Sequence, residues 1–81
     1  MMKRCFAMKF MIRLRNPKEA EEFVHIASGF DYDIDLKTGA AYLDAKSLLG
    51  IISCALNKNA EVICPKGSDD FKKSVSKFAI A

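Results

Sequence analysis

The chain has 81 residues, enough for one hydrophobic core and too few for two, so residues 1–81 are expected to form a single domain. Hydrophobic residues make up 51% of the sequence, which is typical of globular domains and excludes an intrinsically disordered chain. Thirteen basic against ten acidic side chains give a net charge of +3, too small to indicate a nucleic-acid-binding protein.

The cysteines and the N-terminal segment predict a cytoplasmic protein. Cys5, Cys54 and Cys64 are odd in number and lack metal-type spacing, and two of them stand in segments that look buried, so reduced thiols are expected. Residues 1–4 lead into an alternating stretch and not into the unbroken apolar run of a signal peptide. No segment approaches the roughly 20 apolar residues of a membrane span, so no membrane insertion is expected.

The first element is predicted to be a strand over residues 4–14. Lys9 and Arg13 fall at odd positions, and the period of two is that of a half-buried strand. From residue 6 onward the even positions are apolar: Phe6, Met8, Phe10, Ile12 and Leu14.

A helix is predicted to follow the strand. Asn16 is a capping residue, Pro17 suits the first helical position, and Glu19 can reach back to the backbone N–H of the cap. Gly29 is expected to end the helix in the left-handed conformation. The apolar stripe is spaced i, i+3, i+4, i+7: Ala20, Phe23, Val24 and Ala27.

The next segment predicts a hairpin. Residues 31–36 alternate aspartate with apolar residues, as in a strand with one solvated face. Residues 37–39 supply a turn, and residues 40–43 return as a second strand. Asp31, Asp33 and Asp35 are interpreted as surface charges and not as a metal site, because no other ligand accompanies them.

The last third of the chain predicts helix, strand and helix. Ser47 caps a short segment, residues 48–56, that is apolar nearly all the way round and is therefore either buried or a docking site. Residues 61–64 form a strand, and Ser68 is expected to cap a final helix. The inner stripe of that helix is Phe71, Val75, Phe78 and Ala79. The element order β-α-β-β-α-β-α favours an α+β fold of two layers, with the helices on one face of an antiparallel sheet.

Residues 45–53, Ala-Lys-Ser-Leu-Leu-Gly-Ile-Ile-Ser, closely resemble the segment around the regulatory serine of HPr, the small phosphocarrier of the bacterial sugar phosphotransferase system. Phe23-Val24, the hairpin after Gly29 and the closing helix fall in the same order and spacing, so the resemblance covers nearly the whole chain. It implies the HPr-like open-faced sandwich, a four-stranded antiparallel sheet with three helices on one face.

The resemblance breaks down where the family carries its phosphoryl group. An ungapped match puts Asn16 in place of the phosphocarrier histidine, Lys18 in place of an arginine and Glu19 in place of a proline. An amide lacks the basic ring nitrogen that forms a phosphoramidate. The sequence therefore predicts a non-enzymatic protein without a cofactor or a metal, which acts by docking to other proteins and not as a histidine phosphocarrier.

The segment after Ser47 is the predicted docking site. Ile51 and Ala55 are expected to face inward, which leaves Leu48, Leu49 and Ile52 as an exposed patch. In the resembled family the matching positions contact enzyme I, sugar-transport subunits and the HPr serine kinase. These proteins, or a transcriptional regulator, are the expected partners, and phosphorylation of Ser47 is the hypothesis for regulation.

Three alternatives remain open. Arg13, Arg15 and Lys18 surround the start of the first helix and could bind an anion there. The only histidine, His25, could serve as an unorthodox phosphoacceptor, although a solvated surface role is favoured. Finally, a structural domain could use the Leu48–Leu49–Ile52 patch to dimerise weakly, whereas a monomer is the main expectation.

Overall fold

A computed structural model of the chain describes residues 8–80 and has the element order that the sequence predicts. The elements are β1 (Met8–Arg13), α1 (Pro17–Ser28), β2 (Asp35–Thr38), β3 (Ala41–Asp44), α2 (Leu48–Cys54), β4 (Asn59–Cys64), α3 (Asp69–Ser74) and a short 3-10 helix η2 (Ser76–Phe78). The part of the first predicted strand before Met8, with Cys5 and Phe6, lies outside the described residues.

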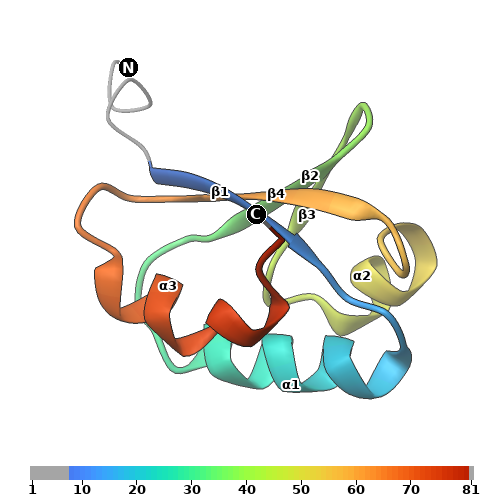
Figure 1. The fold of residues 1–81 in the computed structure, drawn as a ribbon, viewed down its shortest axis with the longest axis horizontal. Coiled ribbons are helices and arrows are strands. Elements are labelled where there is room, and N and C mark those ends of the chain that lie inside the picture. The colour runs from blue at the N-terminus through green and yellow to red at the C-terminus, as the bar shows by residue number, and fades with distance from the viewer. Residues whose placement is uncertain (1–7, 81) are drawn as a thin grey trace.

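The four strands form one antiparallel sheet in the order β1-β4-β2-β3. The helices of the described part all lie beneath one face of this sheet, and the opposite face carries no helix (Figure 1). This is the predicted open-faced α+β sandwich.

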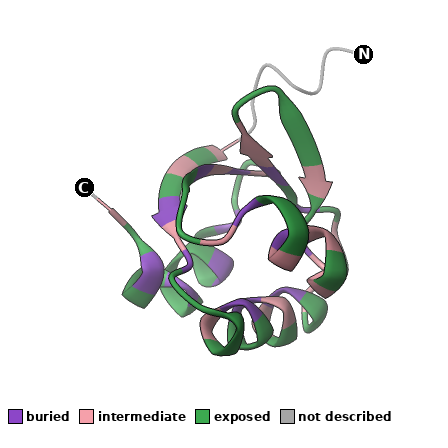
Figure 2. Cartoon of the chain, turned by 90° about the vertical axis from the view of Figure 1, so that its right-hand side faces the viewer, coloured by how far each residue is buried: buried purple, intermediate pink, exposed green. Residues whose placement is uncertain are grey.

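The core lies between the sheet and the helices. Phe23 of α1 and Phe71 of α3 are fully buried, and their ring centroids lie 5.9 Å apart in an edge-to-face arrangement. From the sheet, Ile12, Leu36 and Val62 are fully buried on the same side. In Figure 2 the buried residues of the helices lie toward the sheet and the exposed ones away from it, as the apolar stripes predict.

The helix starts agree with the sequence because their caps are local. Asn16 Oδ1 accepts the backbone N–H of Glu19 at 2.9 Å, and Ser47 Oγ accepts that of Gly50 at 3.3 Å. Ser68 is the exception, because its hydroxyl donates to the Pro65 carbonyl oxygen at 2.6 Å and makes no capping bond. The prediction of a Ser68 side-chain cap is therefore wrong.

Two other predictions of local geometry are wrong. Gly29 has φ −81°, which is right-handed, so helix α1 ends without a left-handed glycine. The strand predicted over residues 31–36 begins only at Asp35, because Asp35 is the first residue there that pairs with β3 and β4. The alternating burial persists through Ile34, which is 1% exposed although it lies before the strand.

The final helix is shorter than predicted. It ends at Ser74, and after Val75 the chain continues in the 3-10 helix η2. Val75 and Phe78 are buried as expected, whereas Ala79 is exposed. Ala79 instead forms an isolated antiparallel bridge with Ile12, and the Ile80 N–H donates to the Met11 carbonyl oxygen, so the end of the described chain lies along the outer edge of β1.

Candidate functional site

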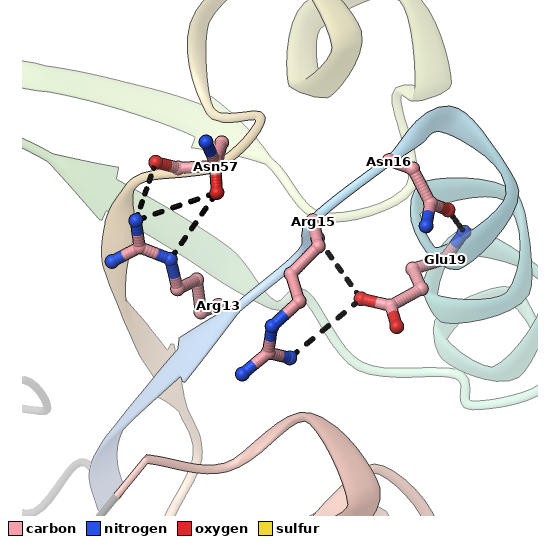
Figure 3. Close-up of polar contacts among 5 residues, drawn as sticks. All are labelled: Arg13, Arg15, Asn16, Glu19 and Asn57. Carbon is pink, nitrogen blue, oxygen red and sulfur yellow. Dashed lines mark hydrogen bonds and ion pairs between the residues drawn. The ribbon is translucent and has the colours of Figure 1, made fainter.

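Side chains at the start of α1 accept backbone N–H groups of the same segment (Figure 3). Asn16 caps the helix through its amide oxygen, as described above. Glu19, in the first turn, accepts the backbone N–H of Arg15 at 2.9 Å and lies 4.0 Å from the Arg15 guanidinium. Glu19 thus reaches back one residue further than predicted, to Arg15 and not to Asn16. Its carboxylate places a negative charge at the positive end of the helix dipole.

Arg13 is held by Asn57, in the loop that connects α2 to β4 (Figure 3), and by Asn59, the first residue of β4. Its guanidinium donates to Asn59 Oδ1 at 2.9 Å, to the Asn57 carbonyl oxygen at 3.1 Å and to Asn57 Oδ1 at 3.3 Å. The Asn57 N–H in turn donates to the Leu14 carbonyl oxygen at 2.6 Å. Asn57 has a positive φ of 58°, and no pattern in the sequence marks it as the partner of Arg13.

The three predicted anion-binding residues therefore differ in their surroundings. Arg13 is half-buried against Asn57 and Asn59, and Arg15 is paired with Glu19. Lys18 is exposed in the first turn of α1. Arg13 and Arg15 are thus held by different partners.

Helix α2 presents a graded apolar surface. Ile51 and Ala55 are fully buried, as predicted for its inward face. Leu49 is 76% exposed, whereas Leu48 and Ile52 are half-buried and pack against the core. The predicted patch is thus one projecting leucine flanked by two partly covered side chains, and not three fully exposed ones.

Ser47 stands at the junction of β3 and α2. It is half-buried, and its Oγ caps α2 at Gly50. Asp44 Oδ1 accepts the Lys46 N–H at 2.9 Å, and Lys46 Nζ donates to the Phe30 carbonyl oxygen at 2.8 Å, so the residues before Ser47 are anchored on both sides.

The remaining candidate groups are separate from these two sites. His25 lies exposed in the last turn of α1, away from the helix start. Cys54 is exposed and Cys64 is buried, and burial raises the pKa of the Cys64 thiol above its ordinary value. Within residues 8–80, no three His, Cys, Asp or Glu side chains gather as a metal ion would require. No helix of that part is long and apolar enough to cross a membrane.

Comparison with known proteins agrees with the fold. No protein with a curated description matches the chain. Similar solved structures include HPr-C-His from Thermoanaerobacter tengcongensis, with a TM-score of 0.69, 19% identity and coverage of 88% of this chain and 86% of that one. They also include the phosphocarrier protein HPr from Bacillus anthracis, with a TM-score of 0.70, 15% identity and coverage of 91% of this chain and 98% of that one. At these identities the two likenesses show the fold.

The family itself is shown by sequence. The model of the PTS HPr component phosphorylation site matches residues 17–78, which is most of the chain. The match begins one residue after Asn16, and it includes Ser47 and all of α2. The chain therefore belongs to the family of HPr components of the phosphotransferase system.

Proposed function

We propose that this member of the HPr family acts by docking to partner proteins and carries no phosphoryl group on histidine. One observation carries the proposal. Asn16, which stands where the family resemblance puts the phosphocarrier histidine, uses its side chain as the cap of α1. An amide offers no basic ring nitrogen, and its oxygen here is already hydrogen-bonded.

Electrostatics at the start of α1 support the same proposal. A phosphoryl group placed there would approach the carboxylate of Glu19, which already accepts the Arg15 N–H. Like charges at short range oppose binding. Anion binding by Arg13, Arg15 and Lys18 is therefore a secondary proposal. Arg15 and Lys18 are the two that lie exposed, and Arg15 is paired with Glu19.

The proposed docking surface is the outer side of α2. Leu49 is a large apolar side chain that projects into solvent, and partners commonly bury such residues. Leu48 and Ile52, one helical turn apart, extend this surface from Leu49 toward the core. The partners proposed are proteins of the phosphotransferase system or its regulators: enzyme I, sugar-transport subunits, the serine kinase or a transcriptional regulator.

Regulation by phosphorylation at Ser47 is the second part of the proposal. A phosphate on Ser47 would add about two negative charges at the N-terminus of α2, where backbone N–H groups favour an anion. The helix would survive the change, but its apolar surface at Leu48 and Leu49 would acquire an adjacent charge. Partner affinity should therefore change without unfolding.

Intact-mass measurement with two phosphoryl donors tests both parts. With ATP and an HPr-type serine kinase, we expect one acid-stable phosphate on the parent and none on Ser47→Ala. Ser53 is an exposed serine of the same helix, and the control variant Ser53→Ala should take up one phosphate as the parent does. With enzyme I and phosphoenolpyruvate, we expect no acid-labile phosphate. An acid-labile phosphate that disappears in His25→Gln would instead establish a histidine phosphocarrier. If a kinase that is active on ordinary HPr adds no acid-stable phosphate to this protein, regulation by phosphorylation of Ser47 is refuted.

A further inference from the structure

The open face of the sheet carries an ordered pattern of charges. Cross-strand pairing aligns Met11 of β1, Glu61 of β4, Lys37 of β2 and Tyr42 of β3 in one row across all four strands. The two ends of this row are the exposed apolar residues, since Met11 is 38% and Tyr42 is 64% exposed. The two middle positions carry opposite charges.

A second row lies beside the first and is polarised from one edge to the other. Lys9 on β1 pairs with Ile63 on β4, Ile63 pairs with Asp35 on β2, and Asp35 pairs with Asp44 on β3. The β1 edge of this row is thus positive and the β2–β3 edge is negative. One oxygen of Asp44 also accepts the Lys46 N–H.

A twofold rotation makes the end residues of both rows and the central charges complementary, and only the pair Ile63 and Asp35 meets without a charge partner. An axis parallel to the strands, between β4 and β2, lays β1 of one copy over β3 of the second and β4 over β2. Glu61 then faces Lys37 of the second copy, Lys9 faces Asp44, and Met11 faces Tyr42. Each contact occurs twice, as a twofold interface requires, and the thioether–ring contact is itself favourable.

A perpendicular in-plane axis that runs through the first row is disfavoured by charge. It would place Glu61 over Glu61 and Lys37 over Lys37 of the second copy, and Lys9 over Arg13. Like charges in direct opposition cost free energy. A perpendicular axis lays each strand over itself, so the pairing of Glu61 on β4 with Lys37 on β2 requires the strand-parallel axis.

We propose that two copies of this chain associate face to face through the open side of the sheet, with Glu61 of each copy paired to Lys37 of the other. Stacked sheets pack about 10 Å apart with their strands within about 30° of alignment, which keeps the central Glu61–Lys37 contacts in register despite the twist. Four short strands make a small interface, so the dimer is weak and its population rises with concentration. The α2 surface lies on the opposite side of the molecule and stays free for docking (Figure 1).

Charge reversal gives a test that a general loss of solubility could not imitate. Sedimentation equilibrium of the full chain between about 10 µM and about 1 mM should show a mass that rises from monomer toward dimer. Lys37→Glu alone and Glu61→Lys alone should each remain monomeric, because each places two like-charged pairs in the interface. An equimolar mixture of the two variants should regain the dimer, since both pairs become attractive again.

The matched control uses the same charge changes elsewhere. Glu21→Lys and Lys73→Glu alter exposed residues of α1 and α3, and each variant alone and their mixture should associate as the parent does.

If a strand variant fails to fold by circular dichroism, Tyr42→Asp, at an exposed position, should abolish association by removing the Met11 contact. A parent that stays monomeric at the highest concentration would overturn the proposal. Association that survives Lys37→Glu would also overturn it, because a dimer paired through the edges of β3 would not depend on Lys37. Association that is lost in Leu49→Asp would overturn it too, because Leu49 lies outside the proposed interface.

Discussion

The amide oxygen of Asn16 lies 2.9 Å from the backbone nitrogen of Glu19, and this bond closes the first turn of α1. The residue that the family resemblance puts in place of the phosphocarrier histidine is therefore part of the helix architecture. Glu19 adds a second closure by accepting the Arg15 N–H. The side chains of Asn16 and Glu19 thus both stabilise the first turn of α1 by accepting backbone N–H groups.

Loss of the Asn16 cap should destabilise the protein measurably. Asn16→Ala is expected to lower the free energy of unfolding by about 1 kcal/mol, because the Glu19 N–H loses its acceptor. Asn16→Asp keeps an oxygen at the same place and serves as the matched control, with a change of a few tenths. Urea denaturation followed by far-ultraviolet circular dichroism measures both. Equal stability of Asn16→Ala and the parent would contradict a capping role.

The two faces of α2 should respond differently to substitution. Leu49→Asp is expected to change the free energy of unfolding by less than about 0.5 kcal/mol, because Leu49 is 76% exposed. Ile51→Ala should cost about 2–5 kcal/mol, because Ile51 is fully buried and its truncation leaves a cavity. The same denaturation experiment compares them. A loss of several kcal/mol in Leu49→Asp would show that Leu49 supports the core, and the docking surface would have to be abandoned.

Features fixed by residues close in sequence were predictable. Asn16-Pro17 and Ser47 define helix starts through bonds that span three residues, and the inward stripe of α1 follows from helical spacing. The order of elements needed no more than these signals and the alternation of the strands. The open-faced arrangement came from the family resemblance and from the two-layer rule together.

Features fixed by distant partners were not predictable. The strand at residues 31–36 is shortened because pairing with β3 and β4 begins at Asp35. Ala79 leaves the last helix because it bridges to Ile12, more than sixty residues away in the sequence. Arg13 looked like a free cation near α1, yet Asn57 and Asn59 hold it. None of these contacts has a signature in a single sequence.

Asn57 should be sensitive to any side chain that disfavours the left-handed region. Its φ of 58° is costly for alanine, by roughly 1–2 kcal/mol, and alanine also removes the Oδ1 acceptor of Arg13. Asn57→Ala should therefore destabilise more than Asn57→Gly, which relieves the backbone strain and loses only the side-chain bond. Thermal unfolding of the two variants and of Arg13→Ala gives the ranking. Equal losses in the alanine and glycine variants would show that the backbone conformation carries no cost.

The two described cysteines should differ in reactivity. Burial raises the pKa of the Cys64 thiol, so less thiolate is present at a given pH, and the sulfur is also shielded from reagents. Cys54 is exposed. Alkylation of the folded protein at about pH 8, with peptide mass analysis, should label Cys54 well before Cys64, and the two rates should become similar in denaturant. Equal labelling of both in the folded state would contradict the burial of Cys64.

The same raised pKa predicts a pH dependence of stability. A thiol that ionises more readily in the unfolded chain than in the folded one stabilises the fold fully below its unfolded pKa, near 8.5, and this contribution is lost as the pH rises through the higher folded pKa. Stability should therefore fall as the pH rises above the unfolded pKa, and less so in Cys64→Ala, which has no thiol to ionise. Other groups titrate in this range, so the difference between parent and variant is the measured quantity. Parallel stability profiles of the two proteins would show that Cys64 ionises equally in both states.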